Sequence, residues 1–436
     1  MSAGAQRILP PELGQKITLM DRVHARLSGM RTQVKGFVYQ PEPRTMGSFA
    51  KGKQLVAGNF QFGGHLVQQP GVRLWDIDAP DAAFAAELNG FGWLDDLAAV
   101  GDGTTRKLAQ DWVMTWIARQ DGVKGAGWSP DLTGRRLIRW IHHAIFLMNG
   151  QSVENNAKYF KSLGQQTAFL ARRWPVAVPG LPRFEALTGL LYAGISLNGA
   201  EHHVEAASKA LARECEREID VQGGLSTRNP EELLEVYTLL SWADAALRGV
   251  DREPLEGHRH AMERIAPSLL ALRHEDGRLA RFHGGGAGQE GRLDQVLSGA
   301  QVPMLAPGAQ AMGFAPLKCG QTSLIADVAP PPRRKSSLNA HASTLAFELT
   351  SARNPLIVNW GSGAPFGIEW RRAGRATPSH STLSIDRVSS AKLTPSADGE
   401  ILSKGPKSVR VIQDRDAAGI RLTASHDGYV PAFGLS

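Results

Sequence analysis

Several features that define other classes of protein are missing from this 436-residue sequence. It has only two cysteines, Cys215 and Cys319, so we expect no disulfide framework, and a CxxC-type metal knot is impossible. No run approaches the roughly 20 apolar residues of a membrane span, and residues 1–16 lack the apolar core of a signal peptide. The sequence alone therefore predicts a soluble protein that is not exported.

The charge favours anionic partners, because the formal net charge is +7 and the pI about 9.5. No Lys/Arg block is long enough to choose among acidic polysaccharide, nucleic acid and membrane surface; the sharpest, residues 333–335, is interpreted as a solvated linker. Residues 284–288 are glycine-rich but lack the Lys-Ser/Thr of a phosphate-binding loop, so no nucleotide cofactor is expected. Nucleic-acid binding has no motif behind it and is not expected.

From about residue 84 to 275 the apolar residues repeat with the period of a helix. Apolar residues recur at steps of three and four, as in Leu137, Ile141 and Ile145. Breakers such as Asn149-Gly150 separate these stripes. Helices of this length, joined by short loops, predict a series of helical hairpins.

After residues 284–286 the apolar period changes to two. The alternating residues are Leu345, Phe347 and Leu349, then Leu383 and Ile385, then Ile420, Leu422 and Ala424. This pattern predicts antiparallel sheets. We expect a mixed segment over 1–80, a helical domain over 81–300 and a β domain over 315–436. Only about six strands fit, fewer than a sandwich usually needs, so either the domain is small or the chain is truncated at its C-terminus; we favour truncation.

The stretch 338–386 holds an ordered set of motif residues. They are His341; Val358, Asn359 and Gly361; and Arg375, Thr377, His380, Thr382, Leu383 and Asp386. This stretch resembles the C-terminal signature of heparinase II/III-like polysaccharide lyases, and residues 127–143, 223–235 and 276–286 resemble pieces of that family's α/α-toroid. The resemblance implies an α+β multidomain protein, in which an incomplete α/α-toroid of helical hairpins precedes an antiparallel β-sandwich.

The resemblance also implies a bacterial lyase that cleaves an acidic, uronic-acid-containing polysaccharide such as a glycosaminoglycan by β-elimination. This reaction needs a group that neutralises the carboxylate, a base for the C5 proton and an acid for the leaving oxygen. In the family a toroid His and a downstream Tyr serve these roles, and here Leu225 and Leu279 stand near those positions. Leucine cannot transfer a proton. The alternative is a catalytically impaired glycan-binding or scaffold protein with the lyase fold.

Three residues of the C-terminal motif are the candidate catalytic residues: Asn339, His341 and His380. Some relatives carry a catalytic His at the position of Asn339, and residues i and i+2 of a strand share a face. In some relatives a His, an Asp and a His bind a structural Zn²⁺, and the equivalents here are His341, Asn359 and His380. Asn in place of Asp lowers the expected affinity for a divalent cation. In the alternative interpretation, the two histidines only stabilise the sandwich.

Four residues are candidates for substrate binding. Arg228 and Asn229 could grip a sugar carboxylate, although Asn229-Pro230 could simply start a helix. Trp128, together with Arg135, could line a sugar groove, where the aromatic ring stacks on a pyranose; helix packing is the alternative for Trp128. Tyr192 and His283 are candidates to replace the missing proton-transfer groups.

The expected partner is an acidic polysaccharide, and the sequence does not predict an oligomeric state. The resemblance implies a location in the cell envelope or periplasm. The N-terminus shows no export signal, so the cytoplasm is the alternative.

Overall fold

The computed structural model describes residues 17–29, 34–120, 127–299, 310–417 and 419–435. The chain divides into two compact units. The helical unit comprises Leu13–Arg217 and Thr238–Arg259, and the β-rich unit contains Glu218–Tyr237 and His260–Ser436. The predicted segments 1–80, 81–300 and 315–436 follow changes of sequence pattern and stay a prediction.

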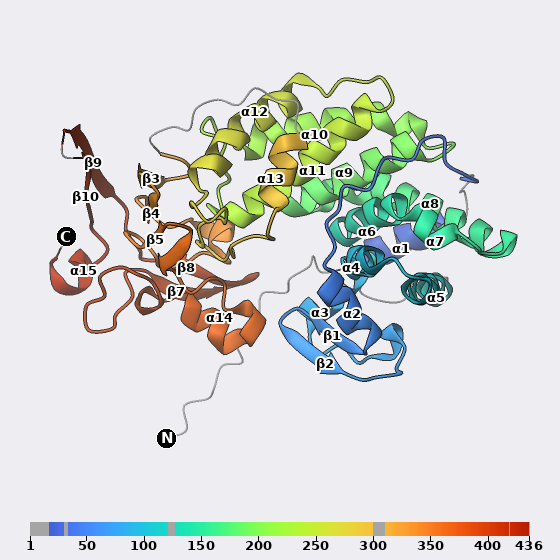
Figure 1. Cartoon of the computed structure of the whole chain (residues 1–436), viewed down its shortest axis with the longest axis horizontal. Helices are drawn as coiled ribbons and strands as arrows, with labels where there is room; N and C mark the ends of the chain where they lie inside the picture. Colours follow the sequence, from blue (N-terminus) through green and yellow to red (C-terminus); the bar gives the residue numbers. More distant parts are fainter. Residues whose placement is uncertain (1–16, 30–33, 121–126, 300–309, 418, 436) are drawn as a thin grey trace. The chain divides into compact units, whose positions relative to one another are not determined.

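Helices dominate the helical unit, as the blue to green ribbons of Figure 1 show. Its helices are α1 (Leu19–Ser28), α2 (Phe49–Val56), α3 (Ala82–Gly90), α4 (Trp93–Val100), α5 (Gly103–Gln120), α6 (Pro130–His142), α7 (Ala144–Met148), α8 (Val153–Arg173), α9 (Leu181–Ser196) and α10 (Val204–Glu218). The boundaries between the units fall at the last residue of α10 and within α11 (Pro230–Arg248) and α12 (Glu256–Ala271). A short hairpin of β1 (Asn59–Phe62) and β2 (His65–Gln68) completes it. In the part of the chain that the structure describes, no helix is long and apolar enough to span a membrane.

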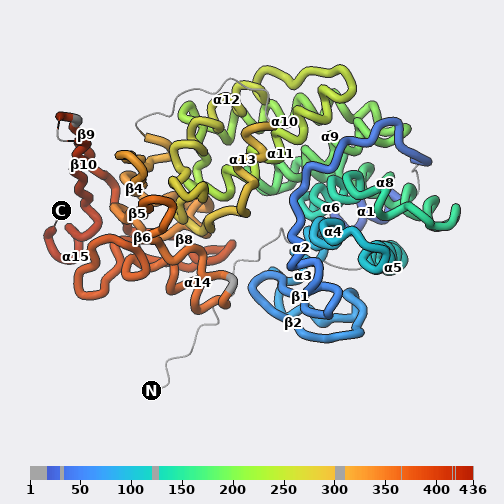
Figure 2. The backbone as a smooth tube through the Cα atoms, in the orientation of Figure 1, coloured from blue at the N-terminus to red at the C-terminus, as the bar shows by residue number. Residues whose placement is uncertain are grey.

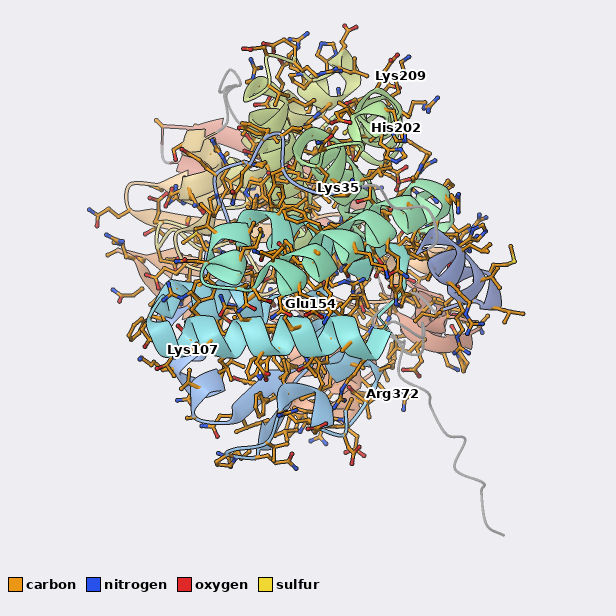
Figure 3. The ribbon with its side chains drawn as sticks, turned by 90° about the vertical axis from the view of Figure 1, so that its right-hand side faces the viewer. Lys35, Lys107, Glu154, His202, Lys209 and Arg372 are labelled. Carbon is orange, nitrogen blue, oxygen red and sulfur yellow. The ribbon has the colours of Figure 1, made fainter. Side chains whose placement is uncertain are left out.

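Local sequence signals fix where these helices begin. Ser152 precedes α8, and its side chain accepts a hydrogen bond from the backbone N–H of Asn155, which satisfies a donor that the first turn leaves free. Pro130 opens α6, where the missing N–H of proline costs nothing. Charged side chains such as Lys107 and Lys209 are exposed on their helices (Figure 3). The helical half predicted from periodicity is confirmed.

An aromatic cluster forms part of the core of the helical unit. Phe91, Trp93, Trp116 and Trp140 are all buried, and their ring centroids lie 4.8 to 5.8 Å apart in edge-on or tilted pairs. The guanidinium of Arg136 lies 4.2 Å from the centroid of the Trp116 ring. Such pairs stabilise the core beyond the effect of simple burial.

Helices α6 and α9 cross where two glycines meet. A Cβ atom added at Gly189 would lie 2.4 Å from the Cα of Gly134, and one added at Gly134 would lie 2.2 Å from the carbonyl oxygen of Glu185. The two backbones can approach this closely only because neither position carries a side chain.

Gly134→Ala is therefore expected to destabilise the helical unit by about 1–3 kcal/mol, although Gly→Ala normally favours a helix. Chemical unfolding followed by tryptophan fluorescence measures the change. Gly92→Ala is the matched control, because a Cβ at Gly92 meets no atom within 4 Å. Equal stability of the two variants would show that the crossing tolerates a methyl group.

The β-rich unit contains antiparallel sheets (Figures 1 and 2). A four-stranded meander runs in the order β3 (Phe314–Cys319), β4 (Thr322–Asp327), β5 (Phe347–Ser351) and β6 (Asn354–Ile357). Two ribbons follow, formed by β7 (Lys392–Ser396) with β8 (Gly399–Ser403) and by β9 (Val409–Asp416) with β10 (Gly419–His426). Its short helices are α13 (Arg292–Gly299), α14 (Ile368–Gly374) and α15 (Val430–Phe433). The predicted antiparallel sheets are confirmed.

Two details of the predicted strands are wrong. Leu383 and Ile385 form no strand: Ile385 makes only an isolated bridge with Val388, and Leu383 is 70% exposed. In β5 the buried face carries Glu348 and Thr350 rather than the apolar residues. His274, Arg281 and the backbone N–H of Asn359 provide partners for Glu348, and these polar contacts override the apolar pattern.

Candidate functional site

A buried carboxylate, Asp327 at the end of β4, is the centre of the candidate site. Its side chain accepts hydrogen bonds from Nη2 of Arg228 at 2.6 Å and from Oγ of Ser343 at 2.9 Å. Nε2 of His283 lies 3.4 Å from Oδ2 of Asp327. Burial alone would raise the pKa of Asp327, but Arg228 and His283 outweigh it and lower the pKa to about 2. The carboxylate is therefore ionised.

His283 connects this carboxylate to the motif histidines. Its Nδ1 accepts a hydrogen bond from the backbone N–H of His341 at 3.2 Å, so the proton of the neutral ring belongs on Nε2, facing Asp327. Burial lowers the pKa of His283, against the opposing influence of Asp327. The following residue, Gly284, has φ of 90°, and a Cβ there would lie 2.9 Å from Asn339. Glycine thus lets the His283 loop pack onto the His341 loop.

The two motif histidines are adjacent, as the resemblance implied. The rings of His341 and His380 stack with centroids 4.9 Å apart and planes 30° from parallel. His341 is fully buried and His380 is 7% exposed, and none of their ring nitrogens has a hydrogen-bond partner. Burial, followed by the charges of His380 and His283, lowers the pKa of His341 well below its usual range. Burial and His283 lower the pKa of His380 to about 4. Both rings are therefore neutral near neutral pH.

Two other motif residues hold the His341 loop in place. Arg375 is 1% exposed and donates hydrogen bonds to the backbone carbonyls of Ser337, Ala340 and Glu400 at 2.7 to 3.0 Å. The hydroxyl of Thr377 donates to the carbonyl of Ala342 at 2.7 Å. Because a buried guanidinium needs its acceptors, these contacts give Arg375 and Thr377 a structural role.

Asn359 is buried between two neighbouring segments. Its backbone N–H donates to Oε1 of Glu348 at 2.8 Å, and its Oδ1 accepts from the backbone N–H and the hydroxyl of Ser381, both at 3.3 Å. Glu348 also lies 3.5 Å from Arg281 and 3.3 Å from His274. The oxygen that the metal prediction assigns to a cation is therefore already an acceptor within the protein.

Asn339 does not share a face with His341. Residues 338–346 form no strand, because the segment bends around Arg375 instead of pairing with a neighbouring strand. Asn339 is exposed, and its Oδ1 accepts from Nη2 of Arg371 at 2.8 Å, whereas His341 is buried. The predicted i, i+2 geometry is wrong at this position.

The predicted sugar-binding residues of the β-rich unit are engaged within the protein. Arg228 is only 9% exposed, and besides Asp327 it donates to the carbonyls of Met312, Gly313 and Pro330 at 2.7 to 2.9 Å. The Oδ1 of Asn229 accepts from the backbone N–H groups of Glu231 and Glu232, which is the arrangement of a helix N-cap. The structure thus matches the helix-start alternative for Asn229.

The other two predicted sugar-binding residues belong to the helical unit. Trp128 is 1% exposed and packs edge-on against Phe169, with ring centroids 5.2 Å apart. Its ring is not accessible to a polysaccharide, which matches the helix-packing alternative. Arg135 is partly exposed and donates from Nε to Oε1 of Glu185 at 2.5 Å. Its role in sugar binding stays a prediction.

The pocket beside Leu279 lacks the side chains expected for proton transfer in a β-elimination. Leu225 and Leu279 are buried, at 4% and 1% exposure. Leu279 lines a pocket of about 630 Å³ in the β-rich unit, together with Arg273, Arg278 and Arg353, and none of its lining side chains is His, Tyr or Lys. Tyr192 lies in the helical unit, where its hydroxyl donates to the carbonyl of Trp242 at 3.1 Å. The described geometry therefore offers no exposed His or Tyr beside Leu279.

The metal prediction can be compared with the geometry of the three named residues. The ring nitrogens of His341 and His380 have no hydrogen-bond partner, whereas Oδ1 of Asn359 accepts hydrogen bonds from Ser381. Among the described residues, no group of three or more His, Cys, Asp or Glu side chains could hold a metal. The cation site of His341, Asn359 and His380 therefore stays a prediction, and no chemical step is assigned to a cation.

The Zn²⁺ implied by the resemblance stays a prediction that metal analysis can test. We expect the dialysed chain to carry less than one equivalent of zinc, and Asn359→Asp to bind it more tightly, because a carboxylate is the stronger ligand. Inductively coupled plasma mass spectrometry gives both values. A full equivalent of zinc that survives dialysis of the unaltered chain would show that the histidines rearrange around a metal.

The sequence indicated His341, His380, Asn359, Arg228 and His283, and the structure brings them into one buried cluster. Asp327 and Ser343 were missed. Asp327 follows the short apolar run 324–326 and precedes the proline-rich segment 330–332 by two residues, and a carboxylate at the end of a buried strand was the available signal. No pattern distinguished Ser343 from the chain's other serines.

Known proteins resemble this chain in sequence and in fold. Residues 303–436 match the family model described as Heparinase II/III-like, C-terminal. FtsZ-localized protein C of Caulobacter vibrioides (strain NA1000 / CB15N) is 30% identical over 367 residues, which are 81% of this chain and 62% of that protein. The chain thus spans less than two thirds of the length of this relative.

Solved structures share the fold. A crystal structure of heparinase III covers 93% of this chain with a TM-score of 0.65 and 14% identity, and 73% of that chain is matched. A mutant of the heparan sulfate lyase HepC from Pedobacter heparinus covers 94% of this chain and 71% of its own length, with a TM-score of 0.54 and 13% identity. The fold is therefore that of the polysaccharide lyases with an α/α-toroid and an antiparallel β-sandwich. Residues 303–436 thus match the Heparinase II/III-like C-terminal family, and the chain shares its fold with the heparinase structures.

Proposed function

We propose that this chain is a binding protein on a lyase scaffold, which recognises an acidic glycan without cleaving it by β-elimination. The observation that carries the proposal is the burial of leucine at both positions where the family's proton-transfer groups are expected. The motif histidines give no replacement, because His341 and His380 are buried and their lowered pKa values make them weak bases. A base must reach the proton that it removes, either directly or through one water molecule.

The lyase activity implied by the resemblance is the competing hypothesis. It requires that the buried histidines become accessible to a substrate, or that a side chain outside the described cluster acts as the base. Isothermal titration of the chain with a heparin oligosaccharide, followed by chromatography of the sugar, separates the two hypotheses. We expect saturable binding and an intact oligosaccharide. Shortened, unsaturated sugar would support the lyase, and absence of binding to any uronate-containing glycan would contradict the proposal.

The printed name of the Caulobacter relative supports a second candidate function, association with FtsZ. Its 30% identity is a nearer sequence likeness than the 13% to 14% of the lyase structures. Sedimentation of the chain with FtsZ polymers tests this candidate, and we expect the chain in the pellet only when polymers are present. Fluorescence imaging of a tagged chain would also distinguish the predicted envelope or periplasmic location from the cytoplasmic alternative.

A further inference from the structure

Two tryptophans of the β-rich unit form an exposed stacked pair. Trp360 follows β6 and Trp370 belongs to α14; their ring centroids are 5.5 Å apart and their planes 10° from parallel. They are 48% and 51% exposed. All ten tryptophans of the chain lie in the described ranges, and the other eight are buried or only partly exposed. Indole rings normally contribute large buried areas, so this exposed pair needs an explanation.

Close backbone packing holds the pair in place. A Cβ atom added at Gly374 would lie 2.9 Å from Cδ1 of Trp360, so the Trp360 ring lies against the end of α14. A Cβ atom at Gly363 would lie 2.4 Å from the carbonyl oxygen of Trp370. Both indoles are thus attached to backbone that cannot separate without loss of packing, and the platform is formed before any ligand arrives.

Further apolar and polar groups accompany the pair in the same segment. Phe366 is 71% exposed and Ile368 is 39% exposed. Arg372, labelled in Figure 3, has a half-exposed side chain that lies 3.3 Å from Glu400. Arg371 is held by Asn339 and by the carbonyl of Leu338. The stacked indoles form a flat apolar surface, and α14 also carries the planar guanidinium groups. Such a surface suits a sugar, whose ring has an apolar C–H face and a rim of hydroxyl groups.

The charge of this region favours an acidic sugar over a neutral one. Residues 331–436 contain 14 Lys and Arg against eight Asp and Glu, so they carry nearly all of the chain's net charge of +7. We propose that the Trp360–Trp370 pair is a glycan-binding platform, on which a sugar of an acidic polysaccharide stacks while arginines of α14 pair with its acid groups. The inference rests on the proposed glycan-binding function and assigns it to exposed side chains rather than to the buried histidines.

Titration of the full chain with a heparin oligosaccharide tests the platform, with a neutral cello-oligosaccharide of the same length for comparison. Trp360→Ala and Trp370→Ala are each expected to weaken heparin binding about tenfold. The control is Phe49→Ala, which removes an aromatic ring that is 59% exposed in the helical unit and should leave affinity unchanged. Circular dichroism shows whether each variant is folded, and loss of the exciton signal of the stacked indoles reports the pair directly.

Different outcomes test the Trp360–Trp370 platform and the glycan-binding function separately. Unaltered heparin affinity in both folded tryptophan variants would overturn the platform and leave the glycan-binding function standing. Failure of the unaltered chain to bind either sugar would overturn both. Tighter binding of the neutral sugar would overturn the acidic preference. If instead the unaltered chain binds only anionic phosphatidylglycerol vesicles and the variants lose that binding, the surface recognises lipid and the glycan platform is wrong.

Discussion

Asp327→Ala is expected to destabilise the β-rich unit by about 3–5 kcal/mol, because it leaves a buried guanidinium without its counter-charge. The carboxylate is fully buried and receives hydrogen bonds from Arg228 and Ser343, with His283 facing it. Alanine removes the acceptor of the Arg228 and Ser343 hydrogen bonds and the charge that faces His283. Desolvating the remaining Arg228 charge is then not offset by an opposite charge. Urea unfolding at about pH 7 measures the loss.

An exposed ion pair of the same unit provides the control for this prediction. Lys335 and Asp398 lie 2.7 Å apart, with side chains 79% and 47% exposed. Asp398→Ala should change stability by less than about 1 kcal/mol, because water solvates both partners. The loss of stability in Asp327→Asn should lie between the losses in Asp327→Ala and Asp398→Ala, because asparagine keeps a hydrogen-bond acceptor and loses the charge. A change of less than about 1 kcal/mol in Asp327→Ala would mean that the Arg228 contacts to backbone carbonyls suffice.

Acidification is expected to destabilise the β-rich unit through its buried histidines. The pKa of His380 is lowered to about 4 in the folded chain, whereas unfolding restores a value near 6.5. The unfolded chain therefore binds a proton in a pH range where the folded chain does not. Stability is fully present above about pH 6.5 and falls as the pH is lowered toward 4, by about 3 kcal/mol for this residue alone.

His380→Asn should reduce this pH dependence, because asparagine does not titrate. Urea unfolding at about pH 7 and about pH 4 gives the two stabilities for each variant. Buried His142 and His258 of the helical unit have lowered pKa values as well, so the informative quantity is the difference between the variant and the unaltered chain. Exposed His202 provides the control, and His202→Asn should preserve the full pH dependence. An identical dependence in His380→Asn would show that His380 is hydrated or paired in solution.

The architecture could be predicted from the sequence because it depends on repeated apolar spacing. Apolar residues spaced three and four apart predicted the helical half, and apolar residues at every second position predicted antiparallel strands such as β10. The pattern failed where polar pairs replace apolar contacts. Glu348 points into the protein because Arg281, His274 and the backbone of Asn359 provide partners for it. Those partners come from distant parts of the chain, and no local pattern contains them.

The sequence predicted which residues belong to the site better than it predicted how they are arranged. The motif indicated His341 and His380, which do stack, but it implied a strand at Asn339 where the chain instead bends around Arg375. Trp128 and Arg228 have the residue types of a sugar site, yet one is a core side chain and the other a buried ion-pair partner. Residue type alone does not separate these roles, since burial depends on the whole fold.

The central claim is that the chain keeps the lyase fold without β-elimination, and a turnover assay tests it most directly. The chain is incubated with heparin, heparan sulfate and polyuronates, and the ultraviolet absorbance of the unsaturated product is followed, with heparinase III as the positive control. The account predicts no increase above the rate without protein for any of these glycans. A steady increase that scales with the amount of the chain, and that disappears in His341→Ala or His380→Ala, would contradict it.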